Sequence, residues 1–289
     1  MFDFIDAFST IFINNPVTFI SFSVLLGLLL GSFLNVVIYR LPKMMEQEWH
    51  NNCLALQGKD IPAQKTYTLS SPRSSCPQCN HPISALENIP ILSYLALGGK
   101  CKACHTKISI RYPLVEFLTG VLLGLIAYQF GYTSTTLFAW LLTLALITLT
   151  FIDFDTQLLP DDITLPLLWL GLLFNLNGGF TDLKSAVIGA VIGYLILWSI
   201  YWLFKLVTKK EGMGYGDFKL LAAIGAWFGW QLIPAVVLLS SVLGATIGVI
   251  LITYKGKTTQ TAIPFGPFLA LGGIAALFFG QQLANFYLI

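Results

Sequence analysis

Four cysteines form two matching pairs, Cys76 with Cys79 and Cys101 with Cys104, and 21 residues separate the pairs. Two thiolates at this C-x-x-C spacing can bind one metal ion from a single tight turn, and two such turns complete a tetrahedral four-sulfur zinc site. Two disulfides are the alternative, but a reducing compartment disfavours them. The pattern therefore predicts a structural zinc ion bound by all four cysteines.

Two aspartates lie at the boundaries of apolar segments. Asp153 ends a long apolar run, and Asp217 follows the sequence GMGYG at 212–216 and precedes another run. Acidic residues are costly in a bilayer, so those found at membrane segments usually mark a function. Two carboxyl groups brought together cannot both ionise cheaply, so the pair shares a proton and can act as base and acid in a hydrolysis. Two separate aspartates solvated at the membrane surface are equally compatible with the spacing.

Other acidic residues near these segments have more ordinary interpretations. Asp161 and Asp162 follow the sequence LLP, which is typical of a turn into a helix. Acidic residues are common at helix starts, so we expect capping here rather than catalysis. Glu116 lies inside an apolar segment and needs a partner, either Arg111 or a polar cavity.

The composition identifies the class of protein that must position these residues. Of the 289 residues, 56% are hydrophobic and 10% are charged, whereas soluble domains carry about 25% charged residues. The apolar residues form long runs without strand-like alternation, which predicts an all-α polytopic membrane protein. The net charge of +2 is too small to indicate nucleic-acid binding.

Eight apolar segments are candidate transmembrane helices. Six have the usual length of roughly 17 to 25 residues, at 18–39, 113–130, 135–152, 186–207, 232–252 and 263 to about 283. Two more, at 163–176 and 220–230, are shorter. We count all eight, because otherwise the later lysines would lie on the opposite side of the membrane from the earlier basic residues.

The basic residues indicate the orientation. With eight crossings, fifteen of the 16 Lys and Arg residues lie on one side, namely Arg40, Lys43, Lys59, Lys65, Arg73, Lys100, Lys102, Lys107, Arg111, Lys205, Lys209, Lys210, Lys219, Lys255 and Lys257. Lys184 alone lies on the side of the termini. The positive-inside rule then places the basic loops in the cytoplasm and both termini outside.

This topology divides the chain into three regions. Residues 1–39 contain the N-terminal region and the first transmembrane helix, residues 40–112 form a small cytoplasmic zinc-binding domain, and residues 113–289 contain the other spans and both aspartates. The middle region is too small for a large core, so a metal ion would help to order it. No internal repeat is evident.

Several motifs together resemble the bacterial type IV prepilin peptidases, a family of membrane aspartic proteases with a GxGD loop. The motifs are GSFLNVVIYRLP at 31–42, the two C-x-x-C pairs, RYPLVE at 111–116, Asp153 with LPD at 159–161, and GYGD at 214–217. They occur in order over nearly the whole chain. The resemblance implies that Asp153 and Asp217 are catalytic, that Cys76, Cys79, Cys101 and Cys104 bind zinc, and that 113–289 is the protease domain.

The resemblance also implies the reaction, its substrates and its location. Members of the family cut the leader of type IV prepilins and of type II secretion pseudopilins after a glycine, at the cytoplasmic face of the bacterial inner membrane. Members with the N-terminal cytoplasmic domain also methylate the new amino terminus with S-adenosylmethionine. No glycine-rich nucleotide motif identifies a site for this methyl donor, and membrane lipid is the only other partner expected.

Two other functions remain possible from the residues alone. A proton-coupled transporter also uses intramembrane acids, but it would place them near the middle of broken helices. A metal-dependent lipid-phosphate transferase would use Asp153, Asp155, Asp161 and Asp162 as magnesium ligands.

Overall fold

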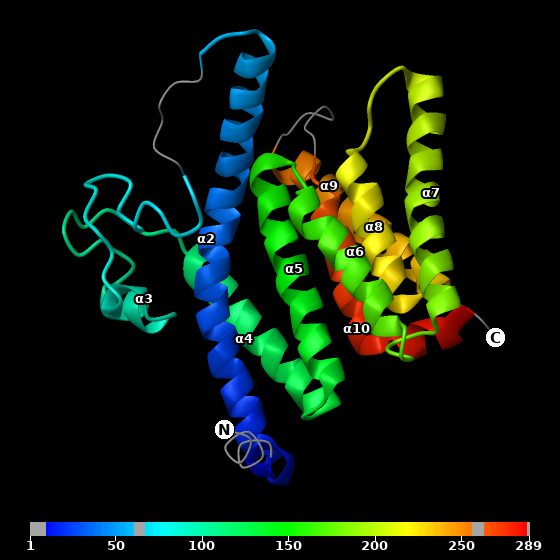
Figure 1. Cartoon of the computed structure of the whole chain (residues 1–289), viewed down its shortest axis with the longest axis horizontal. Coiled ribbons are helices and arrows are strands. Elements are labelled where there is room, and N and C mark those ends of the chain that lie inside the picture. Colours follow the sequence, from blue (N-terminus) through cyan, green and yellow to red (C-terminus); the bar gives the residue numbers. More distant parts are fainter. Residues whose placement is uncertain (1–9, 61–66, 256–262, 288–289) are drawn as a thin grey trace. The chain divides into compact units, whose positions relative to one another are not determined.

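The protein is helical in the computed structural model, which describes residues 10–60, 67–255 and 263–287 (Figure 1). In this part of the chain there is no strand beyond two isolated bridges, Ser75 with Pro82 and Lys100 with Lys107. The all-α prediction is therefore confirmed. The chain divides into two compact units, Met1–Leu144 and Ala145–Ile289.

Helix α2 is much longer than the first predicted span. It begins at Pro16, where Asn15 caps it by accepting the Thr18 N–H at 3.4 Å, and continues to Leu56. Its 41 residues give a length of about 60 Å, twice the roughly 30 Å of a bilayer core. The helix passes through Pro42 into a segment rich in Met, Glu and Gln, which are good helix formers. It therefore extends well beyond the apolar segment.

Helix α4 (Arg111–Phe130) packs closely along α2 in the first unit. A Cβ atom added to Gly27 would lie 2.8 Å from Cα of Gly120, and one added to Gly31 would lie 2.7 Å from Cα of Glu116. The two helices are antiparallel, because the later residue of α2 meets the earlier residue of α4. Small residues at such an interface allow the backbones to approach, as is common between membrane helices.

Helix α8 (Tyr215–Phe228) is the buried centre of the second unit, and every residue from 220 to 228 is buried. It contacts α6 (Asp161–Asn175), α7 (Leu183–Thr208) and α10 (Gly266–Tyr287). Helix α7 is antiparallel to α8, since Gly189 meets Gly225 and Gly193 meets Leu221.

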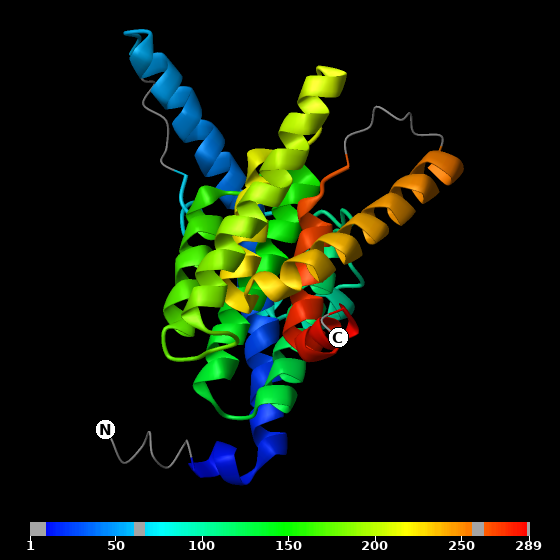
Figure 2. The ribbon, with the colours of Figure 1, turned by 90° about the vertical axis from the view of Figure 1, so that its right-hand side faces the viewer.

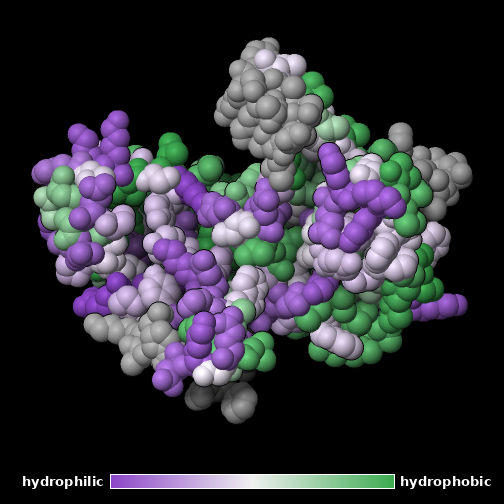
Figure 3. All heavy atoms as spheres, turned by 90° about the horizontal axis from the view of Figure 1, so that it is seen from above, coloured by the Kyte–Doolittle hydropathy of each residue, from purple (hydrophilic) through white to green (hydrophobic). Residues whose placement is uncertain are grey.

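Helix α6 runs parallel to α8, because its contacts with α8 follow the same order along both helices. The Lys219 ammonium group donates to Asp161 at 2.7 Å near the start of both helices, and the Asn175 amide donates to the carbonyl of Ala226 at 2.8 Å near the end of both. The starts of α6 and α8 therefore lie at the same end of this unit as the end of α7. Figure 3 looks onto that end and shows hydrophilic side chains there, with hydrophobic ones along the flank.

Six helices of the described residues are long and apolar enough to cross a membrane. They are Pro16–Leu56, Arg111–Phe130, Ser134–Thr156, Leu183–Thr208, Trp230–Leu251 and Gly266–Asn285. The two shorter predicted segments form α6 and α8, of 15 and 14 residues, or about 22 and 21 Å, and the predicted total of eight spans is not confirmed. The alternating directions of α6, α7 and α8 are nevertheless those that successive crossings would have.

Helices α7 and α9 (Ile233–Lys255) diverge towards their C-terminal ends (Figure 2). Both carry apolar side chains exposed from the protein there, including Leu203 and Val207 of α7 and Val249 and Ile250 of α9. In a multi-pass membrane protein such surfaces face lipid rather than water.

Candidate active site and metal centre

Asp153 and Asp217 are both buried and both belong to the second unit. Asp153 lies in the last turn of α5 (Ser134–Thr156), and Asp217 lies in the first turn of α8. Their exposed fractions are 4% and 7%. Carboxyl groups are almost never this buried without partners that justify it, so the surroundings of each group decide what it can do.

The carboxylate of Asp153 is bound to the start of α10. The backbone N–H of Gly266 donates to Oδ2 of Asp153 at 3.0 Å. Gly266 is the first residue of α10, where unpaired N–H groups and the helix dipole favour negative charge. A Cβ atom added to Gly266 would lie 2.6 Å from the same oxygen, so only glycine allows this approach.

Leu159 brings the segments that carry the two aspartates together. A Cβ atom added to Gly216, the neighbour of Asp217, would lie 2.7 Å from Cβ of Leu159. One added to Gly266 would lie 3.1 Å from Cδ2 of the same leucine. The segment after α5 is therefore packed against the starts of both α8 and α10.

Asp217 has one oxygen without a hydrogen-bond partner. Its Oδ1 is buried and finds none among the described residues, while its backbone N–H donates to the carbonyl of Gly214 at 3.3 Å. A buried polar atom left unpaired is costly and calls for an explanation, such as a catalytic role. The arrangement suits a pair of carboxyl groups that exchange protons with a water molecule and a substrate.

The neighbouring acids are arranged differently. Asp161 and Asp162 occupy the first turn of α6, but the capping position is Pro160, which makes no side-chain capping bond. The prediction that they cap the helix is wrong in this respect. Asp161 instead accepts from the Lys219 ammonium group at 2.7 Å through both oxygens.

The four acids proposed as magnesium ligands do not gather into a metal site. Asp155, Asp161 and Asp162 are exposed, whereas Asp153 is buried. In the described ranges, the one group of three or more close metal-ligating side chains is the cysteine tetrad.

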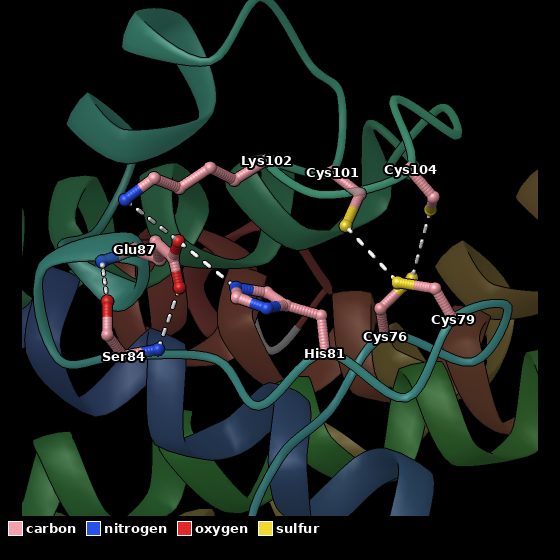
Figure 4. A network of polar contacts seen from close by, with 8 residues as sticks. All are labelled: Cys76, Cys79, His81, Ser84, Glu87, Cys101, Lys102 and Cys104. Atoms are coloured by element: carbon pink, nitrogen blue, oxygen red, sulfur yellow. Dashed lines mark hydrogen bonds and ion pairs between the residues drawn. The ribbon is translucent and has the colours of Figure 1, made fainter.

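The four cysteine sulfurs form a compact cluster in the first unit, as the sequence predicted for a metal site. All four lie within 4.8 Å of one another, with Sγ of Cys76 3.8 Å from that of Cys104 and Sγ of Cys79 3.9 Å from that of Cys101 (Figure 4). Zinc–sulfur bonds of about 2.3 Å in a tetrahedron place the sulfurs about 3.8 Å apart. The cluster therefore has the dimensions of a four-thiolate metal site, and its cysteines are not joined as disulfides.

The two cysteine turns repeat one local structure at an interval of 25 residues. In the first, the Asn80 N–H donates to the carbonyl of Cys76 at 2.9 Å; in the second, His105 donates likewise to Cys101 at 2.9 Å. Asn80 and His105 both have positive φ, 57° and 56°. This repeat was not predicted from the sequence, although the matching C-x-x-C-x-x-x-I-S segments at 76–84 and 101–109 reveal it.

Glu87 connects the two turns (Figure 4). Its carboxylate accepts from the Ser84 N–H at 2.8 Å, lies 3.4 Å from Nε2 of His81, and lies 3.7 Å from Nζ of Lys102. His81 follows the first cysteine pair and Lys102 lies within the second. The Ser84 N–H, together with the His81 ring, lowers the pKa of the Glu87 carboxyl to about 2.

Glu116 finds a different partner from those the sequence suggested. Its Oε2 accepts the backbone N–H of Ile91 at 2.8 Å, and its Cα lies against α2, where a Cβ atom added to Gly31 would approach it to 2.7 Å. Ile91 has φ of +59°, which is rare for a β-branched residue and costs roughly 1 to 3 kcal/mol. The buried glutamate therefore ties this strained part of the loop to α2 and α4.

The fold and these two sites define a multi-pass α-helical membrane protein with two buried aspartates in one unit and a four-cysteine cluster that could hold a metal ion. The chain belongs to the type IV leader peptidase family: residues 140–249 match that family, and residues 25–130 match the Bacterial Peptidase A24 N-terminal domain. The predicted family is thus confirmed, and with it the class of enzyme, a membrane aspartic protease.

Named relatives resemble almost the whole chain. This chain is 54% identical over 276 residues to the prepilin leader peptidase/N-methyltransferase of Pseudomonas aeruginosa, and the match covers 95% of each chain. It is 55% identical to the protein of the same name from Aeromonas salmonicida, covering 94% of this chain and 95% of that one. The Neisseria gonorrhoeae protein of this name is 53% identical over 86% of each chain. No solved structure matches the chain.

Proposed function

We propose that this protein removes the leader of type IV prepilins and pseudopilins by hydrolysis after a glycine, and then methylates the new amino terminus. Asp153 and Asp217 are the catalytic residues in this proposal. The observation that carries it is that two buried carboxyl groups converge at one end of the second unit, one bound to the α10 N–H and the other with an unpaired oxygen.

The two carboxyl groups would divide the work of hydrolysis between base and acid. Asp153, whose charge the Gly266 N–H stabilises, takes a proton from water as the water oxygen attacks the scissile carbonyl carbon. Asp217 donates its proton to the carbonyl oxygen through Oδ1, the oxygen that has no other hydrogen-bond partner. When the tetrahedral intermediate collapses, the amine leaves with a proton and the pair returns to its starting state.

The location we propose is the bacterial inner membrane, with the active site at the cytoplasmic face and membrane lipid around the helices. Fifteen of the 16 basic residues fall on one side of an eight-crossing topology, which supports this orientation. The starts of α6 and α8 and the end of α7 lie at one end of the second unit, and Lys205, Lys209, Lys210 and Lys219 lie there. A substrate with an apolar helix in the membrane would thus present its leader at that end.

We assign the cysteine tetrad to a structural zinc ion. Cys76, Cys79, Cys101 and Cys104 supply four thiolates at the spacing of a tetrahedral site, which is the usual ligand set for structural zinc. The ion would close the domain at 40–112, leaving 1–39 as the N-terminal anchor region and 113–289 as the protease domain. A closed four-sulfur site has no open position, so the zinc takes no part in hydrolysis.

The methyl donor we propose is S-adenosylmethionine, which acts as a substrate. The α-amino nitrogen released by cleavage attacks the methyl carbon, the carbon–sulfur bond breaks, and the donor leaves as the neutral thioether. The amine must be unprotonated to attack, and a free α-amino pKa of about 7.7 to 8.0 provides a useful neutral fraction near neutral pH.

Mass spectrometry of a purified prepilin tests both activities. The wild-type protein, reconstituted in lipid with S-adenosylmethionine, should convert the prepilin into a product shorter by the leader and heavier by one methyl group. Without the methyl donor, the product should be cleaved but unmethylated. An uncut prepilin would contradict the protease proposal, and an unmethylated product with ample donor would contradict the methyl-transfer proposal alone.

A further inference from the structure

The ion pair between Asp161 and Lys219 has no role in the hydrolysis described above. Nζ of Lys219 lies 2.7 Å from both carboxylate oxygens of Asp161, so the contact is short and bidentate. Both side chains reach solvent, with exposed fractions of 29% for Lys219 and 53% for Asp161. Exposed ion pairs generally contribute little to stability, so stability alone does not account for this geometry.

The pair connects the two segments that carry the catalytic aspartates. Lys219 follows Asp217 by two residues on α8, and Asp161 follows Asp153 by eight residues across the α5–α6 connection. Between Asp153 and Asp161 lies Leu159, which packs against Gly216 and Gly266. The ion pair thus closes a ring of contacts that contains both aspartates.

The other polar contacts that the structure gives between α6 and α8 lie farther from the site. Trp227 bonds to Leu167, and Asn175 bonds to the carbonyls of Ala226 and Trp227, near the opposite end of α8. These contacts align the two helices without fixing the first turn of α8. Asp217 and Lys219 lie in that first part of the helix, where the ion pair acts.

We propose that Asp161 and Lys219 form a positioning pair that sets the approach of Asp217 to Asp153. The inference rests on the proposed protease function and assigns neither residue to contact with substrate. Removing either partner would leave the start of α8 free to shift against the α5–α6 connection. A displacement of about 1 Å in a reacting group can lower a rate by roughly a hundredfold.

The test compares single substitutions with a charge-swapped pair in the full-length protein. Asp161→Asn and Lys219→Met should each lower kcat for prepilin cleavage roughly tenfold to a hundredfold, with KM changed less than about twofold because substrate contacts remain. The double variant Asp161→Asn/Lys219→Met should be no worse than the poorer single variant. Lys219→Arg should keep most of the activity, because a guanidinium group can also bind both oxygens.

The charge swap Asp161→Lys/Lys219→Asp should recover at least half of the loss in log kcat that the single variants show. Full recovery is not expected, because the lysine would then lie at the unfavourable end of α6. Asp162→Asn is the matched control, since Asp162 is an exposed neighbour on the same turn. It should cleave at the wild-type rate.

Thermal unfolding in detergent separates a positioning effect from a folding defect. The single variants should unfold within a few degrees of the wild type while losing kcat. Wild-type kcat in both single variants, or fully additive losses without recovery in the swap, would overturn the inference. If the wild-type protein itself leaves prepilin uncut, the proposed function fails instead, and the two failures are distinguishable.

Discussion

The backbone N–H of Gly266 donates a 3.0 Å hydrogen bond to the Asp153 carboxylate across 113 positions of the sequence. This contact joins the start of α10 to the end of α5 at the proposed catalytic centre. Gly266→Ala should therefore reduce cleavage at least tenfold or so, because the new Cβ would meet the carboxylate at 2.6 Å and displace it. Kinetics on a purified prepilin would measure the loss.

Gly248→Ala is a suitable control for this substitution. A Cβ atom at Gly248 would meet only Cδ1 of Ile263, at an ordinary 3.4 Å, so cleavage should stay near the wild-type rate. Equal activities of the two variants would show that the Gly266 contact is unimportant.

The carboxylate pair predicts a specific response to substitution and pH. Asp153→Asn and Asp217→Asn should each lower cleavage by roughly 10² to 10⁴ or more, since each removes one proton-transfer group. Asp155→Asn should be mild, because Asp155 is exposed and lies outside the pair. The wild-type rate should depend on pH as a bell-shaped curve, because one carboxyl must be ionised and the other protonated. Near-normal cleavage by either Asn variant would exclude the pair.

The four-thiolate cluster predicts one zinc ion per chain. Replacing Cys76 and Cys104 by serine should bring the metal content of the purified protein close to zero and expose the 67–109 segment to protease, because metal binding and folding of such a loop are coupled. Cys53→Ser should leave the metal content unchanged, since Cys53 lies on α2 and outside the cluster. Elemental analysis makes the comparison, and equal zinc in the double variant and the wild type would refute the assignment.

Glu87 should stabilise the cysteine turns in its ionised form. Its pKa in the folded protein is about 2, mainly because the Ser84 N–H and the His81 ring favour the carboxylate. An ordinary glutamate has a pKa of about 4.3. The stabilisation is therefore fully present above that value and disappears as the pH falls towards 2.

Glu87→Gln should accordingly release zinc to a chelator faster than the wild type at pH 7. A ¹³C NMR titration of the Glu87 carboxyl should give a midpoint well below 4.3. An ordinary midpoint, or equal zinc release from the two proteins, would contradict this role.

The orientation predicts where Cys53 can be labelled. Cys53 is exposed on the part of α2 that extends beyond the apolar segment, on the side assigned to the cytoplasm. A membrane-impermeant thiol reagent added to intact cells should leave it unlabelled, and permeabilised cells should show labelling. Strong labelling in intact cells would reverse the topology.

Local sequence patterns were sufficient to predict much of the structure of this protein. Apolar length predicted the positions of all the long helices, because a bilayer requires a continuous apolar helix. The C-x-x-C spacing predicted the four-sulfur cluster, because the two cysteines of each pair lie on one turn. Hydropathy did not predict the end of α2 at Leu56. It shows which residues favour the membrane over water, but it does not show that a helix continues from the apolar segment into the polar one. The predicted eight crossings are not confirmed, because α6 and α8 are too short to be among the six helices that could span a membrane by length and composition.

Only the tertiary structure decided which distant residues meet. Membrane helices are apolar on all sides, so their sequences carry no polar face that predicts how each helix is rotated in the bundle. The contacts of Asp153 with Gly266, of Asp161 with Lys219 and of Glu116 with Ile91 depend on that rotation and on the order in which the helices pack. The sequence by itself therefore determined the chemical groups and the membrane class of the protein, and the packing of its helices decided which groups act together.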